Sequence, residues 1–308
     1  MNNSGTELCL EQDSFAFSPV EQAVENVRFQ RSFWKTLWSG MMANKLAMLC
    51  VFFLCIIFLS SAFAFLAPYD PDATSMKEKF LLPSAAHWFG TDHMGRDYFT
   101  RCLYGGRVSI AVGIFSMLVS VVIGTLYGSI SGFAGGKVDA FMMRALDIFM
   151  SIPTMLLIII INSMISTNVF TLVMIIGVFS WMSVARIVRA ETLSVKERDY
   201  VTAARNLGIS SAGIILRHVI PNIGVPIIVA STINVARAIL MESSLSYLGF
   251  GVQIPTASWG SMLQNAQSYI LDRPLLAVYP GVLILFMVLS LNFLGDILHN
   301  ILEPRLVK

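Results

Sequence analysis

The feature that most constrains this chain is an uninterrupted apolar segment at residues 46–67, which contains no charged side chain. An α-helix rises about 1.5 Å per residue, so this segment reaches about 33 Å and can cross the hydrocarbon core of a bilayer. It is too long, and begins too far from Met1, to be a cleaved signal peptide. The segment therefore predicts a transmembrane helix.

Five further apolar segments are long enough to cross a bilayer: residues 108–131, 141–164, 169–188, 223–248 and 275–301. Only 13% of the residues are charged, whereas soluble domains carry about 25%. The sequence therefore predicts an all-α integral membrane protein with six transmembrane helices. Gly124, Gly128 and Gly132 recur at every fourth position, which favours close packing within the chain or against a second subunit.

Basic residues predict which side of the membrane each connection faces, because they collect on the cytoplasmic side. With the N-terminus inside, the inner segments hold fourteen basic residues and the outer loops hold six, while Arg237 lies within a span. Both termini are therefore expected in the cytoplasm, as is the connection at residues 190–222.

The segments around the spans have different expected roles. Residues 1–30 are expected to be a flexible cytoplasmic tail. Residues 31–45 have an amphipathic pattern, which predicts an interfacial helix that anchors the first span (residues 31–67 in all) at the inner leaflet. Residues 68–106 would form a large extracytoplasmic loop, and residues 107–303 a core with five spans.

The extracytoplasmic loop carries four charged residues close together: Asp92, Arg96, Asp97 and Arg101. Asp97 and Arg101 are four residues apart, so we expect them to form an ion pair on a short helix capped by Thr91 or Asp92. Two interpretations remain open for this loop. It is either a folded cap over the spans or a docking platform for an extracellular partner.

The polar, basic connection at residues 200–222 is the most informative segment. Its apolar positions at helical spacing are Tyr200, Ala203, Ala204 and Leu207. They predict one face of a short helix, with alanines that would let a partner approach closely. Gly208 predicts the helix stop, and Ser210 or Ser211 the N-cap of a second helix that ends before Pro221. Such a helix, turn and helix on the aqueous side is expected to be a docking element.

Two charges lie within the fifth predicted span, Arg237 and Glu242. A charge at the centre of a membrane helix costs about 3 kcal/mol unless it is paired or hydrated. Their spacing places them about 140° apart, so they cannot pair on one face. Each is expected to contact another helix or to line the path of a translocated solute.

No segment predicts catalysis. The sequence GFAGGKVD looks like a phosphate-binding loop, but Ser131 and Val138 stand where that pattern needs Gly and Ser or Thr. The cysteines and histidines have no metal-site spacing, and no nucleophile with a base is evident. We expect a non-enzymatic chain with no metal and no cofactor of its own.

The 200–222 connection resembles the cytoplasmic signature of binding-protein-dependent ABC importer permeases, E-A-A-x-x-x-G followed by I-x-L-P. Ala203, Ala204, Gly208 and Pro221 match, whereas Thr202 replaces the glutamate. The sequences GTDHMGRD, GGKVD, ESSLSYLGFG, PTASWGSML and NFLGDIL are similar to the peptide, nickel and opine branch of that family. The chain looks most like the oligopeptide permease C subunits.

The resemblance implies a type I ABC importer permease fold in a bacterial inner membrane and a subunit that translocates oligopeptides or dipeptides. It implies a homologous second permease subunit, two ATPase subunits that bind ATP and Mg²⁺, and an extracytoplasmic solute-binding protein. Nickel–chelator complexes, glutathione or opines are alternative cargoes of the same machine. An ion-coupled carrier would need ionisable relays and an inverted repeat, and a structural scaffold would leave residues 200–222 unexplained.

Overall fold

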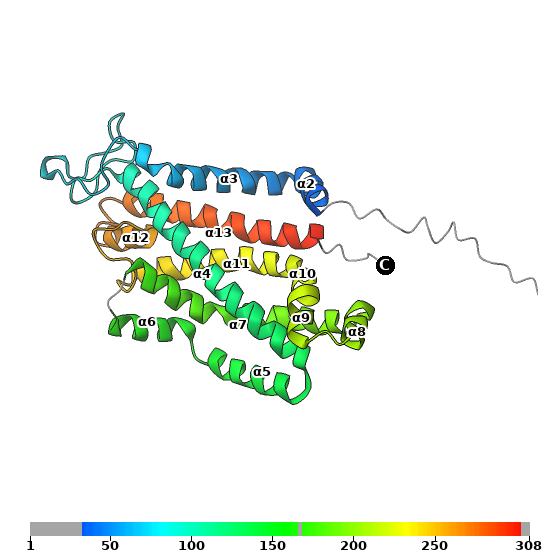
Figure 1. Cartoon of the computed structure of the whole chain (residues 1–308). Helices are drawn as coiled ribbons and strands as arrows, with labels where there is room; N and C mark the ends of the chain where they lie inside the picture. The colour runs from blue at the N-terminus through cyan, green and yellow to red at the C-terminus, as the bar shows by residue number, and fades with distance from the viewer. Residues whose placement is uncertain (1–32, 166–167, 303–308) are drawn as a thin grey trace, which may run out of the picture.

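The computed structural model describes residues 33–165 and 168–302, which form helices joined by loops (Figure 1). Five helices are long and apolar enough to cross a membrane: α3 Lys45–Ala62, α4 Tyr98–Ala134, α7 Val169–Lys196, α11 Gly224–Tyr247 and α13 Leu275–Leu302. The pair α5 Gly136–Ser151 and α6 Thr154–Met164 is a sixth candidate if it counts as one span. The prediction of an all-α membrane protein is confirmed, with five or six spans.

The third predicted span is broken rather than continuous, because α5 and α6 meet at an angle of 74°. The break falls at Pro153, which directly precedes α6. Its ring disfavours the helical conformation at Ile152, and that residue is extended, with φ −89° and ψ 127°. The kink that this proline predicts within the third span is confirmed, and the angle is large enough to divide the span into two helices.

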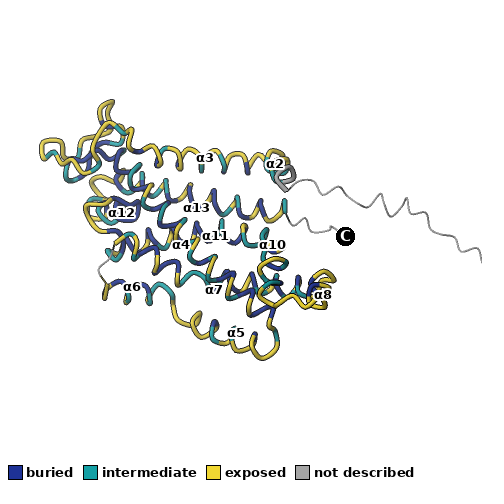
Figure 2. The backbone as a smooth tube through the Cα atoms, in the orientation of Figure 1, coloured by how far each residue is buried: buried dark blue, intermediate teal, exposed yellow. Residues whose placement is uncertain are grey.

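Helices α4 and α11 form the centre of the bundle (Figure 1). α11 packs against α4, α7 and α13, while α3 covers α13 and α4 from the other side. Burial is concentrated on these inner helices, whereas α3 and α5 are largely exposed (Figure 2). Because exposed apolar side chains run along the outer helices, the surface of the bundle suits a lipid environment.

The glycine repeat on α4 lies against α7. A Cβ atom on Gly124 would lie 2.7 Å from Cβ of Val184, and one on Gly132 would lie 2.9 Å from the carbonyl oxygen of Arg189. A real side chain at these positions would force the two helices apart. The predicted close packing is therefore confirmed, and the partner helix belongs to the same chain.

Helix α2, Phe33–Ala43, lies where the interfacial helix was predicted. Gly40 of α2 contacts Ile301 near the end of α13, so both ends of the described chain lie at one end of the bundle (Figure 1). The predicted tail at residues 1–30 lies outside the described residues. The position of α2 in a membrane stays a prediction.

The start of α4 and the presence of α12 differ from the prediction. Helix α4 begins at Tyr98, inside the segment predicted as loop 68–106, because the Asp97 side chain accepts a hydrogen bond from the backbone N–H of Thr100 and caps the helix there. A short helix that was not predicted, α12 Trp259–Gln267, lies between α11 and α13. Ser258 and Ser261 form the capping box that begins it.

Candidate functional site

The segment from Asp199 to Asn222, here called the α8–α10 element, lies at the same end of the bundle as α2 (Figure 1). It begins with α8, Asp199–Asn206, and Gly208 follows with φ +78°. The Gly208 N–H bonds to the Arg205 carbonyl at 3.0 Å, and the Ile209 N–H bonds to the Ala204 carbonyl at 3.2 Å. This pair of bonds is the Schellman motif, so the helix stop predicted at Gly208 is confirmed.

The second half of the element does not end before Pro221, as was predicted. Ser210 caps α9, Ser211–Ile214, as expected, but the chain then continues through the π-helical turn η3, Ile215–Val219, into α10, Ile220–Asn222. The Ile220 N–H bonds to the carbonyl of Ile215, five residues back. This wider turn gives the Pro221 ring the room that an α-helix would deny it.

The predicted apolar face of α8 is divided between two sides. Ala204 is buried together with Val201, and both pack with Ile214 and Val219. Burial of Val201 was not predicted from the sequence. Tyr200, Ala203 and Leu207 point away from the bundle instead. Helical spacing places residues on one face, but an alanine can lie on a buried or an exposed side. The spacing alone therefore could not show that Ala204 is buried and Ala203 exposed.

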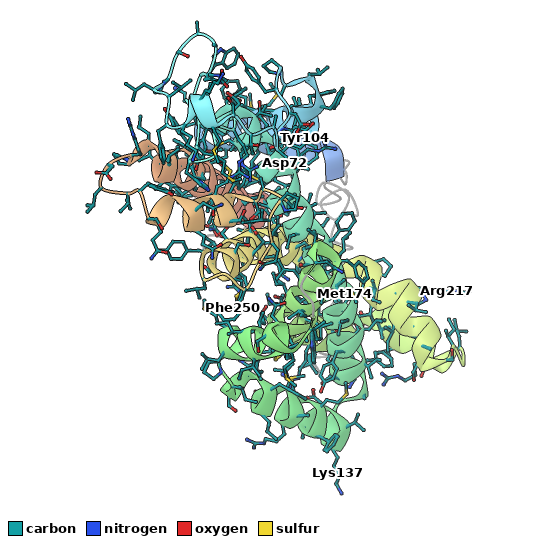
Figure 3. The ribbon with its side chains drawn as sticks, turned by 90° about the vertical axis from the view of Figure 1, so that its left-hand side faces the viewer. Asp72, Tyr104, Lys137, Met174, Arg217 and Phe250 are labelled. Carbon is teal, nitrogen blue, oxygen red and sulfur yellow. The ribbon has the colours of Figure 1, made fainter. Side chains whose placement is uncertain are left out.

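The outward side of the α8–α10 element exposes large apolar side chains, although the segment as a whole is polar and basic. Leu207 is 81% exposed and Leu216 is 60% exposed in the described part of the chain. The exposed positions also include Thr202, at the place of the motif glutamate, and the basic residues Arg205 and Arg217. Figure 3 shows the part that carries Arg217 standing off to one side of the bundle. A surface of this kind suits a protein partner.

Contacts beneath the element fix it to the bundle. The Asp139 carboxylate of α5 accepts hydrogen bonds from Nε and Nη2 of Arg189 on α7, each at 2.5 Å, and one from Ser131 of α4. The guanidinium of Arg205 lies 5.5 Å from the centre of the Phe133 ring. These contacts were not predicted, because their partners are far apart in the sequence. The polar contacts hold α4, α5 and α7 together, and the buried side chains Val201, Ala204, Ile214 and Val219 attach the element to Phe133 of α4 and to Val188 and Val195 of α7.

The two charges of α11 have different environments. Glu242 is fully buried, and its carboxyl accepts hydrogen bonds from Ser109 of α4 at 2.8 Å and from Ser246 at 2.7 Å. The hydroxyl of Ser109 also accepts from the backbone N–H of Trp259, at the start of α12. Glu242 thus makes the inter-helix contact that was one of its two predicted roles. Arg237 is exposed, so it does not face the interior of this chain.

The four charged residues predicted in the α3–α4 loop are buried. Asp92 accepts from Nε of Arg96 at 2.7 Å, while Arg101 donates to Asp72 at 2.9 Å. Asp97 accepts from His87 at 2.9 Å, so the predicted ion pair between Asp97 and Arg101 is wrong. Asp97 caps α4 with its side chain, which leaves Arg101 to reach back across the loop. All four predicted residues build the fold of the loop, and any docking surface consists of other side chains.

The apolar helices, the buried polar contacts between them and the protruding α8–α10 element define a multi-span membrane protein with a helical projection at one end. Residues 124–308 match the family model described as the inner membrane component of binding-protein-dependent transport systems. Residues 32–83 match the model of the N-terminal TM domain of oligopeptide transport permease C. The chain belongs to the family of binding-protein-dependent inner membrane transport components.

Relatives of similar length match most of the chain. The oligopeptide transport system permease protein OppC of Bacillus subtilis is 36% identical over 90% of this chain and 91% of its own length. The dipeptide transport system permease protein DppC of the same organism is 37% identical over 89% and 87%. OppC of Haemophilus influenzae is 37% identical over 93% of each chain.

Proposed function

We propose that this chain is a transmembrane permease subunit of an ATP-driven importer that carries oligopeptides or dipeptides across a bacterial inner membrane. The observation that carries the proposal is the α8–α10 element, a helical projection whose outward side exposes Leu207 and Leu216. A chain whose only role was to span a bilayer would not need this helical projection. The relatives named for oligopeptide and dipeptide transport support the cargo.

In this proposal the α8–α10 element binds a groove of an ATPase subunit, which holds ATP and Mg²⁺. The second permease subunit completes the solute path, and an extracytoplasmic binding protein delivers the peptide. Both chain ends and the α8–α10 element face the cytoplasm, in line with the excess of basic residues there. Closure of the ATPase pair would move the element, and the contacts beneath it would pass that movement to α4, α5 and α7.

Uptake by cells that express the complete transporter tests the proposal. We expect a labelled tripeptide to accumulate, with accumulation lost when this chain is deleted and restored when it is supplied again. Unlabelled dipeptides and tripeptides should compete, whereas nickel–chelator complexes and glutathione should not. Peptide uptake that is unchanged by the deletion would overturn the proposal, and competition by glutathione or a nickel–chelator complex alone would reassign the cargo.

A further inference from the structure

Arg237 is an exposed cation in the middle of a membrane-spanning helix. It lies thirteen residues into α11, Gly224–Tyr247, and no hydrogen bond or ion pair joins it to another residue in the described part of the chain. Contact between an unpaired guanidinium and lipid at this depth costs about 3 kcal/mol or more. Arg237 therefore faces protein or water rather than lipid in the assembled transporter.

The face of α11 that carries Arg237 is continuous and uncovered. Leu240, Ser244 and Leu248 are all exposed and lie within about 60° of Arg237 around the helix axis. The opposite face packs against α4 and α7, and α13 covers one flank. One stripe of α11 is thus open along about three turns, from mid-depth to the end of the helix.

Leu240, Ser244 and Leu248 of this stripe line a cavity of about 450 Å³ whose walls come from α6, α11, α12 and α13. The cavity is mostly apolar, but Ser244 and Tyr247 line it with hydroxyl groups. Neither hydroxyl makes a hydrogen bond to another described residue. A volume of this size, with an apolar lining and a few polar groups, is typical of a small-ligand site. Ser244 is seven residues from Arg237, or about 10 Å along the helix.

We propose that Arg237 binds the C-terminal carboxylate of the transported peptide while the cavity beside Ser244 and Tyr247 holds the adjacent part of the peptide. A guanidinium fits a carboxylate through two parallel hydrogen bonds, and it stays charged at every physiological pH. The apolar walls accept side chains of different kinds, so the site fixes the end of the peptide without selecting its sequence. This inference rests on the proposed peptide import.

Uptake by the complete transporter of two labelled forms of trialanine, the free acid and the C-terminal amide, tests the inference. Arg237→Gln should lower the uptake of the free acid about tenfold, the effect of losing one charge-assisted contact, and that of the amide less than twofold. Arg237→Lys should lie between Arg237→Gln and the unmodified chain. Lys137→Gln, which removes an exposed cation at the other edge of the bundle (Figure 3), should change neither.

A second readout does not depend on the amide being a good substrate. A photoreactive group on the C-terminal residue of the free-acid peptide should label α11, and Arg237→Gln should abolish that labelling. Equal loss of uptake for both peptides, with labelling unchanged or with dissociation of the second permease subunit, would overturn the inference in favour of a subunit contact. Absence of peptide uptake by the unmodified transporter would instead refute the proposed function.

Discussion

At the scale of single residues, buried polar groups determine where helices meet. Glu242 has no basic partner among the described residues, and hydroxyl groups satisfy its carboxyl instead. Ser109 both donates to Glu242 and accepts from the Trp259 N–H, so one hydroxyl links three helices. Removal of the carboxyl would leave the hydroxyl hydrogens of Ser109 and Ser246 without this acceptor, which costs about 1–3 kcal/mol for each. The sequence predicted that Glu242 is inside, but not which serines surround it.

We expect His93 to make the α3–α4 loop sensitive to acid. Burial lowers the pKa of His93, the neighbouring Arg96 and Arg101 lower it further, and Asp92 opposes them. The unfolded loop would therefore bind a proton more readily than the folded loop below about pH 6.5. Stability contributed by neutral His93 should be complete above that pH and should fall as the pH drops towards the folded-state pKa. We expect faster hydrogen exchange in residues 75–97 at about pH 5.5 than at about pH 7.5, after correction for intrinsic rates.

The variant His93→Phe is the matched control for this prediction. The imidazole of His93 stacks on Tyr269 with ring centres 5.6 Å apart, and phenylalanine would keep that contact without a titratable group. The difference in exchange between the two pH values should shrink in His93→Phe. An identical pH response in both proteins would show that the effect does not come from His93.

At the scale of helices, the close approach of α4 to α7 depends on the glycines of α4. A Cβ atom on Gly128 would overlap the carbonyl oxygen of Ala185, which is backbone and cannot move aside. Gly128→Ala should therefore destabilise the protein by about 1–3 kcal/mol and lower its melting temperature in detergent by several degrees. A Cβ atom on Gly281 of α13 would lie 4.0 Å from its nearest neighbour, so Gly281→Ala should melt like the unmodified chain. Equal melting of both variants would show that the two helices can separate freely.

The α8–α10 element shows what the sequence could predict at this scale and what it could not. Gly208 predicted the helix stop because only a residue without a side chain adopts φ +78° at no cost. No atom lies within 4 Å of where its Cβ would be, so the backbone conformation, and not crowding, explains the glycine. The direction of each face was not predictable. Ala204 is buried because Val188 and Val195 of α7 lie beneath it, and their position depends on a helix crossing that no local pattern encodes.

At the scale of the whole molecule, apolar length predicted the architecture because a bilayer admits few alternatives for the backbone. Long-range contacts were not predictable in the same way. Asp139 and Arg189 are fifty residues apart, and they meet only because the glycines of α4 bring α7 close. The break at Pro153 similarly lets α5 contact both α4 and α7, while α6 takes a different direction and contacts α7. The apolar pattern of the sequence therefore predicted the spans, whereas the packing of the helices determines which charged residues form ion pairs.

The projection of the α8–α10 element beyond the bundle predicts that its apolar surface binds the ATPase. Burial of Leu207 in a partner groove would contribute about 1.5–3 kcal/mol, and an aspartate there would also have to lose its hydration. Leu207→Asp should therefore reduce ATPase co-purification in mild detergent more than tenfold and abolish uptake, with unchanged melting of the isolated chain. Melting should not change because Leu207 is already 81% exposed and supports little of the fold.

The same substitution at the opposite end of the molecule separates docking from a general effect of charge. Leu271 is 94% exposed and lies in the connection between α12 and α13, far from the α8–α10 element (Figure 1). Leu271→Asp should leave ATPase co-purification at the level of the unmodified chain, because the two ends are separated by the full length of the spans. An ATPase yield that falls equally in both variants would indicate non-specific destabilisation. A normal yield with Leu207→Asp would place the docking surface elsewhere, for example around Leu216 on the second half of the element.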